Sequence, residues 1–143
     1  IVLIYSDFLG LINLMVIVMD NIKLIIPKKS EYISTIRLTT SSLSNIDGFD
    51  IDEIEDLKVI VSEVCIFFIN NVVSNEKPLE IDYLIENDIF KVEVTDLNDG
   101  EFIVNNGINN EMCVLIIKSL SDKYKIDIEN KKISFEKKFI NIE

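Results

Sequence analysis

One long amphipathic segment, residues 49–73, constrains the fold of this chain more than any other part of the sequence. Asp50 stands where a helix N-cap residue is expected, and Glu53 follows three residues later, which together make an aspartate form of the capping box. Apolar side chains then recur at intervals of three and four residues, as on one face of an α-helix. These residues are Ile54, Leu57, Val61, Val64 and Phe68. The pattern predicts a long helix with one buried face.

A strand and a second helix are predicted before this segment. Residues 21–27 form an apolar run that ends at a proline, which is typical of a strand. Ser30 is expected to cap the helix that follows, with Glu31 in its first turn. Its buried face is predicted from the helical spacing of Tyr32, Ile33, Ile36, Thr40 and Leu43, and Asp47-Gly48 is expected to end it.

Two hairpins and a third helix are predicted in the second half of the chain. Alternating runs at 79–85 and 90–96 predict one hairpin, and those at 124–128 and 133–137 predict another. Between the hairpins, a polar loop over 97–110 leads into a short apolar helix over 111–120. This order of elements predicts an α+β fold: a two-layer α/β sandwich, with three helices on one face of a mostly antiparallel sheet.

Composition narrows the function. The chain has 143 residues, enough for one domain, and a formal charge of −11, which argues against nucleic-acid binding. An acidic surface serves solubility alone or attracts a basic partner surface. The chain has no histidine, and its cysteines, Cys65 and Cys113, stand apart within apolar runs. We therefore expect no metal site, no Ser-His or Cys-His nucleophile pair, and two reduced thiols in a cytoplasmic protein.

The first eighteen residues differ from the rest. They are almost wholly apolar, and the chain does not begin with methionine, whereas Met19-Asp20 makes a natural start. We interpret residues 1–18 as an N-terminal extension, possibly translated upstream sequence or an artefact, and residues 19–143 as the single domain. A membrane anchor is the alternative, but the run barely reaches spanning length and Asp7 interrupts it. A signal peptide is disfavoured because no basic region precedes the run.

Two longer stretches, residues 30–39 (SEYISTIRLT) and 52–63 (DEIEDLKVIVSE), resemble the anti-sigma factor serine kinases of the GHKL, or histidine-kinase-like, ATPase superfamily. The resemblance runs from about Asn21 to Phe139. It implies a Bergerat-type α/β sandwich that binds ATP with magnesium. In that family the kinase homodimerises, captures a sigma factor and phosphorylates a serine of an anti-anti-sigma protein.

The resemblance assigns roles to individual positions, and several of them are altered here. Glu63 stands at the position of the catalytic glutamate, where a carboxylate can act as general base, although a solvated helix carboxylate is the alternative. One turn later, Phe67 replaces the asparagine that binds magnesium. Asp96 matches the aspartate that hydrogen-bonds adenine, although it could simply start a turn.

The segments expected around the phosphates are altered as well. Leu97-Asn98-Asp99-Gly100 follows Asp96 in place of the expected Asp-x-Gly turn. The lid is shorter than is usual in the family, and residues 109–113, at its end, contain no glycine. Glu111 stands where a helix N-terminus should hold phosphates, and its charge would repel a triphosphate.

We therefore expect a degenerate family member, a pseudokinase without ATP turnover or a bound cofactor. The resemblance places Arg37, the only arginine, at a position that contacts the sigma factor and the anti-anti-sigma protein; a surface arginine without a role is the alternative. The predicted function is a bacterial anti-sigma-factor-like regulator that binds a sigma factor or a STAS-type anti-anti-sigma protein, with a homodimer possible and no membrane association expected. The alternative is an active ATP-dependent serine/threonine protein kinase.

Overall fold

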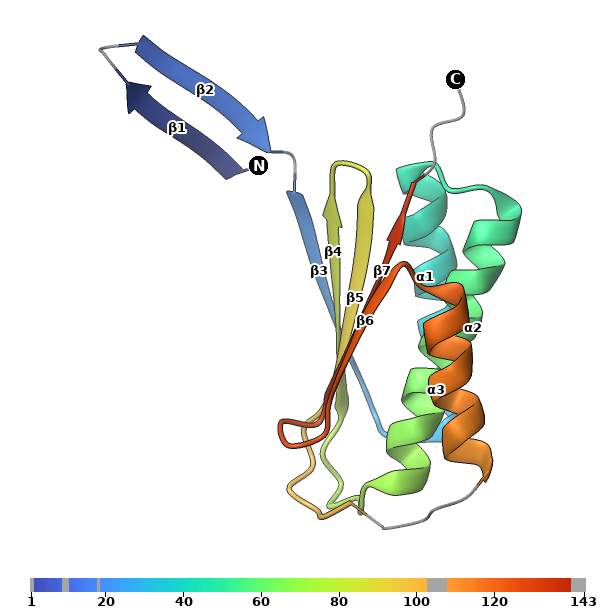
Figure 1. Cartoon of the computed structure of the whole chain (residues 1–143). Helices are drawn as coiled ribbons and strands as arrows, with labels where there is room; N and C mark the ends of the chain where they lie inside the picture. Colours follow the sequence, from blue (N-terminus) through green and yellow to red (C-terminus); the bar gives the residue numbers. More distant parts are fainter. Residues whose placement is uncertain (1, 9–10, 18, 103–107, 140–143) are drawn as a thin grey trace.

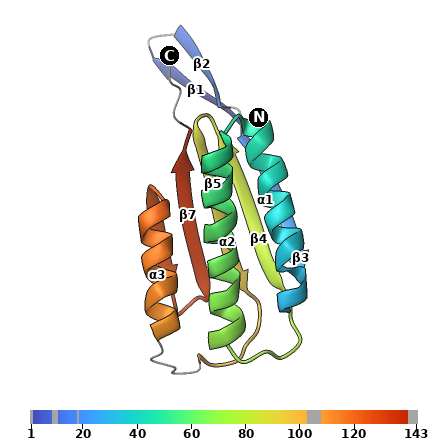
Figure 2. The same cartoon turned by 90° about the vertical axis from the view of Figure 1, so that its right-hand side faces the viewer.

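A computed structural model describes residues 2–8, 11–17, 19–102 and 108–139. Its centre is a five-stranded, fully antiparallel sheet in the order β3-β4-β5-β7-β6. The strands are β3 (Met19–Ile26), β4 (Leu79–Glu86), β5 (Ile89–Asp96), β6 (Lys123–Asp127) and β7 (Lys132–Lys138). The helices α1 (Ile33–Asp47), α2 (Ile51–Asn71) and α3 (Ile108–Leu120) lie side by side on one face of this sheet, with α2 in the middle (Figure 1, Figure 2). The predicted two-layer α/β sandwich is confirmed.

The long helix α2 forms for the reasons that its sequence predicts. The Asp50 side chain accepts a hydrogen bond from the Glu53 backbone N–H at 2.8 Å, and the Glu53 carboxylate accepts one from the Asp50 N–H at 3.1 Å. All five residues of the predicted stripe are buried. They pack on the inner face of the sheet, where Ile81, Tyr83, Val92 and Phe135 are also buried. The helix is therefore fixed between the sheet and its two neighbouring helices.

The start of α1 differs from the prediction. Residues Ser30–Tyr32 form a single 3₁₀ turn, and no side chain caps either that turn or α1. The expected Ser30 cap is wrong, because the 3₁₀ turn places Ser30 ahead of the α-helix. Tyr32 is 38% exposed and lies outside the buried face, whereas Ile36 and Thr40 are buried as predicted. Gly48, with φ of 95°, ends the helix in the left-handed conformation that glycine tolerates.

Elsewhere the boundaries shift by a few residues. The helix α3 begins three residues earlier than predicted, at Ile108. Part of the predicted loop over 97–110 lies outside the described residues. Before β3, the strands β1 (Val2–Phe8) and β2 (Leu11–Ile17) pair with each other as a separate two-stranded sheet, beyond the end of β3 and away from the helices (Figure 1). Among the described residues, no helix combines the length and the apolar character needed to cross a membrane.

Candidate functional site

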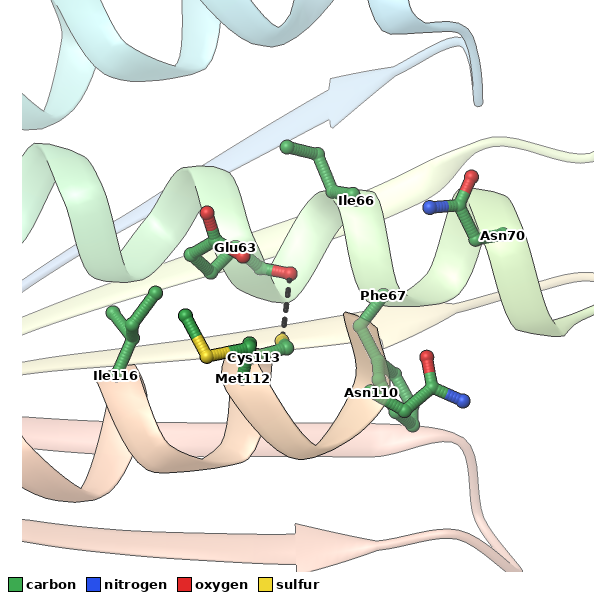
Figure 3. Close-up of a pocket in the computed structure, with 8 residues that line it drawn as sticks. All are labelled: Glu63, Ile66, Phe67, Asn70, Asn110, Met112, Cys113 and Ile116. Carbon is green, nitrogen blue, oxygen red and sulfur yellow. Dashed lines mark hydrogen bonds between the residues drawn. The ribbon is translucent and has the colours of Figure 1, made fainter. Parts of the chain in front are cut away.

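A groove of about 310 Å³ lies between α2 and α3, and we call it the α2–α3 groove (Figure 3). Its lining comprises Glu63, Ile66, Phe67 and Asn70 of α2 with Asn110, Met112, Cys113 and Ile116 of α3. Glu63, the predicted general base, lies in this groove and is partly exposed. No hydrogen bond or ion pair of its carboxylate is found within the described residues. The carboxylate is therefore available to a ligand or a partner.

Phe67 occupies the wall of the groove one turn beyond Glu63. The residue is only 8% exposed, and its ring contacts those of Phe68 and Phe102 at centroid distances of 5.8 and 6.2 Å. A benzyl side chain offers no oxygen to magnesium, which prefers oxygen ligands. In the part of the chain that the structure describes, no group of three or more acidic, cysteine or histidine side chains could hold a metal ion.

Two asparagines tie the first turn of α3 to the last turn of α2. The amides of Asn71 and Asn110 donate to each other's carbonyl oxygens at 2.9 and 2.8 Å. Asn71 also donates to the Phe67 backbone carbonyl at 2.8 Å. Glu111 is exposed in the first turn of α3, next to this amide pair. The beginning of α3 is thus fastened to α2 and carries a negative charge.

Asp96 lies at the end of β5, with its side chain fully buried. Its Oδ2 pairs with the Lys28 ammonium at 2.7 Å, and the Lys28 side chain is only 2% exposed. Its Oδ1 accepts hydrogen bonds from the Asn98 backbone N–H at 2.9 Å and from the Asn98 side-chain amide at 2.6 Å. Lys28 donates further to the Val72 carbonyl, at the C-terminus of α2. Both carboxylate oxygens of Asp96 are therefore engaged inside the protein.

The residues after Asp96 serve the packing of the loops. Asn98 is buried, and its Oδ1 accepts hydrogen bonds from the backbone N–H groups of Asn75 and Lys77 at 2.8 and 2.9 Å. Gly100 lies against the backbone of Val73: a Cβ at this position would be 2.1 Å from the Val73 carbonyl oxygen. This glycine thus permits a close approach between two loop segments of the chain itself.

Arg37 lies on the other side of α2 from the α2–α3 groove. It is exposed on α1 and lines a second groove, of about 350 Å³, together with Ile33, Ser34, Leu38 and Lys58; we call it the α1–α2 groove. Lys58 forms an ion pair with Glu55 at 2.7 Å, and this lysine, with a smaller contribution from Arg37, lowers the pKa of the Glu55 carboxyl. The three predicted site residues, Glu63, Asp96 and Arg37, therefore lie in three separate surroundings.

The cysteines are shielded. Cys113 lines the α2–α3 groove and its thiol donates to the Glu63 backbone carbonyl at 3.2 Å. Burial, with a smaller effect of the Glu63 charge, raises the pKa of the Cys113 thiol to about 12, and burial alone raises that of Cys65 to about 12. Neither thiol forms the thiolate that a nucleophile requires near neutral pH.

Sequence reasoning missed Lys28 and the Asn71–Asn110 pair. Lys28 carries a weak signal, a lysine directly after a strand that ends in proline, but nothing in the sequence indicates its partner. The two asparagines stand in different segments, so their pairing becomes visible only when α2 and α3 are packed together.

The order of elements, the antiparallel sheet and the three helices on one face define a GHKL-like α/β sandwich. No protein-family model matches the chain. The serine-protein kinase RsbW of Halalkalibacterium halodurans is 30% identical over 77 residues, which cover 54% of this chain and 48% of that protein. The serine-protein kinase RsbW of Bacillus cereus is 46% identical over 46 residues, 32% of this chain and 29% of the relative. The chain is therefore similar to serine-protein kinases of this kind over part of its length, and its matches span about half or less of these relatives.

Proposed function

We propose that this chain is a regulatory protein of the anti-sigma-factor type, which binds a sigma factor or a STAS-type anti-anti-sigma protein and does not turn over ATP. One observation carries most of this proposal. Asp96, at the position that the family uses for adenine, is buried with both oxygens engaged by Lys28 and Asn98. A nucleobase could reach this carboxylate only by breaking a buried ion pair, which is costly because it leaves a charge without its partner.

The groove next to the expected phosphate position supports the same conclusion. Phe67 replaces a metal ligand with a ring packed among other aromatic side chains. Glu111 adds a negative charge to the first turn of α3, and the Asn71–Asn110 pair holds this turn against α2. Gly100, which could have served a close approach to a ligand, is used against the Val73 backbone. These residues do not fit magnesium–ATP, and we derive no catalytic step through it.

Partner binding is assigned to the α1–α2 groove. Arg37 and Lys58 place two cations beside Leu38, which is 70% exposed, on a chain whose formal charge is −11. A guanidinium can hold a partner carboxylate with two parallel hydrogen bonds, and an adjacent apolar side chain adds buried area. We propose that this surface binds an acidic region of the partner, with Arg37 as its main polar contact.

Two measurements test the proposal. Titration calorimetry of the full chain with ATP and MgCl₂ should give no heat of binding up to millimolar nucleotide, and radiolabelled ATP should transfer no phosphate to a STAS-domain protein. The chain, affinity-tagged and expressed in its native cell, should co-purify with a sigma factor or a STAS-domain protein. Arg37→Ala should weaken this capture about tenfold or more, since an interface arginine is a frequent hot spot, whereas Lys125→Ala, on the distant strand β6, should leave it unchanged.

The alternative activity predicts the opposite results. Micromolar binding of magnesium–ATP together with phosphorylation of a serine in the STAS-domain protein would establish an active kinase and overturn the proposal. If Arg37→Ala captures the partner as well as the unchanged protein does, the partner does not bind through Arg37 in the α1–α2 groove. That result would not bear on the proposed absence of ATP turnover.

A further inference from the structure

The α2–α3 groove has an apolar character that the proposed function does not use. Ile66 of α2 is 36% exposed and Met112 of α3 is 52% exposed, and both line the groove (Figure 3). Beyond the lining, Val59 of α2 is 37% exposed and Leu115 of α3 is 56% exposed. Apolar side chains gathered in this way on the surface of a protein are typical of a binding site.

The groove also carries a negative charge, from Glu63. Glu63 is the only charged residue among those that line it, since the others are apolar side chains, two asparagines and a cysteine. The carboxylate stands between Val59 and Ile66 on the same face of α2, because residues at i, i+4 and i+7 of a helix lie in one stripe. An occupant that covers the apolar stripe therefore meets a negative charge at its middle, and covering an unpaired carboxylate is costly unless the occupant supplies a cation.

The dimensions favour a helix as the occupant. The stripe from Val59 to Ile66 extends about 10 Å along α2, at about 1.5 Å per residue. On α3, Met112 and Ile116 line the groove one turn apart. Two neighbouring helices with apolar rows form a groove of the kind that receives the apolar face of an amphipathic helix. A second copy of this chain that used the same groove is disfavoured, because the described residues that line it offer no cation to pair with the Glu63 carboxylate of the other copy.

We propose that the α2–α3 groove docks a short amphipathic helix of a partner protein, which places apolar side chains between Ile66 and Met112 and a lysine or arginine against Glu63. The α2–α3 groove lies on the opposite side of α2 from the α1–α2 groove. It prefers a basic partner segment, whereas the α1–α2 groove is proposed to bind an acidic one. The inference rests on the proposed absence of ATP from this groove, which the calorimetric titration tests separately, and it does not depend on the role of Arg37.

The test uses two synthetic helical peptides and the full chain labelled with ¹⁵N. The first peptide has leucines at positions i, i+4, i+7 and i+11 with lysines beside this stripe, and the second has glutamates in place of the lysines. Titration with the lysine peptide is expected to move the amide resonances of residues 59–67 and 112–116. The glutamate peptide is expected to bind at least about tenfold more weakly, because like charges oppose each other across the interface.

Variants separate docking in the groove from general attraction to an acidic protein. Glu63→Gln is expected to weaken binding of the lysine peptide about threefold to tenfold. Met112→Lys is expected to weaken it about tenfold or more, because it removes a central contact. Glu129→Gln, at an exposed carboxylate in the turn between β6 and β7, serves as the control and should keep the dissociation constant within about twofold. All three side chains are partly or largely exposed, so the variants are expected to fold, which their amide spectra will check.

Three results would overturn the proposal. The first is a dissociation constant for the lysine peptide that Glu63→Gln and Met112→Lys leave unchanged. The second is a set of shifted resonances on another face of the protein. The third is a dimer, seen by sedimentation, that Met112→Lys dissociates, because it would show that a second copy occupies the groove.

Discussion

Replacing Lys28 by methionine tests the reasoning about the buried ion pair most directly. Lys28→Met keeps the length and apolar stem of the side chain but removes its ammonium. Asp96 then stays fully buried with only the two Asn98 donors, and the Val72 carbonyl loses its hydrogen bond. Removing one partner of a buried pair costs about 3–5 kcal/mol. Because a domain of this kind is stable by only about 5–15 kcal/mol, the loss should be obvious.

The assay is a double-mutant cycle. The free energy of unfolding of each variant is measured in urea at pH 7, with circular dichroism as the signal. Lys28→Met and Asp96→Asn are each expected to be strongly destabilised. The double variant is expected to lose much less than the sum of the two, since neither charge is then left alone. Lys77→Met is the control: its ion pair with Asp99 also measures 2.7 Å, but the two side chains are 50% and 77% exposed. Its cost should stay within about 1 kcal/mol.

The reasoning is refuted if Lys28→Met costs no more than Lys77→Met, or if the effects of the two buried substitutions simply add. Either result would mean that Asp96 finds another partner or water at little cost. In that case Asp96 would remain available to a ligand, and the main support for the proposed loss of nucleotide binding would disappear.

Three further predictions concern stability. Asp47, in the last turn of α1, has its pKa raised by burial and secondarily by the charge of Asp20, and its Oδ2 has no hydrogen-bond partner within the described residues. A raised pKa in the folded state means that stability falls as pH rises through it; Asp47→Asn should therefore stabilise the protein by about 0.3–1 kcal/mol at pH 7. That gain should shrink as the pH approaches about 4, and an equal gain at both pH values in urea unfolding would contradict this account. Gly100→Ala should cost at least about 1–3 kcal/mol, because its Cβ would meet the Val73 carbonyl oxygen at 2.1 Å. At Gly48 an added Cβ would lie 3.6 Å from the Phe139 ring, but φ is 95°, so Gly48→Ala should cost about 1–2 kcal/mol from backbone strain alone. If calorimetry finds that Gly100→Ala does not change the stability, the loop moves away freely and the reasoning about Gly100 is wrong.

Local patterns predicted most of the fold. The capping box and the five-residue stripe of α2 are confirmed, because both depend on residues within a few positions of each other. The two hairpins are confirmed for the same reason: each joins adjacent strands through a short turn. The predicted cap of α1 was wrong because Ser30–Tyr32 form a 3₁₀ turn, which places Ser30 inside that turn and ahead of the α-helix, where it caps neither.

The candidate site was only partly predictable. The expectation that Phe67 stands at a metal-ligand position came from the resemblance to a known family and stays a prediction. The Lys28–Asp96 pair joins the end of β3 to the end of β5 across the sheet. No periodicity or spacing reports such a contact, because it depends on the order of strands in the sheet. The same holds for the α2–α3 groove, since its two rows of apolar side chains come from helices that are distant in the sequence.

The Lys28–Asp96 pair also explains how this fold can remain stable without a nucleotide. A ligand that binds only the folded state at 100 times its dissociation constant adds about 2.7 kcal/mol of stability. A chain without that ligand must close the same region with its own contacts, and Lys28 joins β3, β5 and the end of α2 at one point. The Asn71–Asn110 pair joins the last turn of α2 to the first turn of α3 in the same way, beside the α2–α3 groove. On the proposed function, these internal contacts take the place of the nucleotide, and the two grooves that flank α2 would then be presented to partners without ATP.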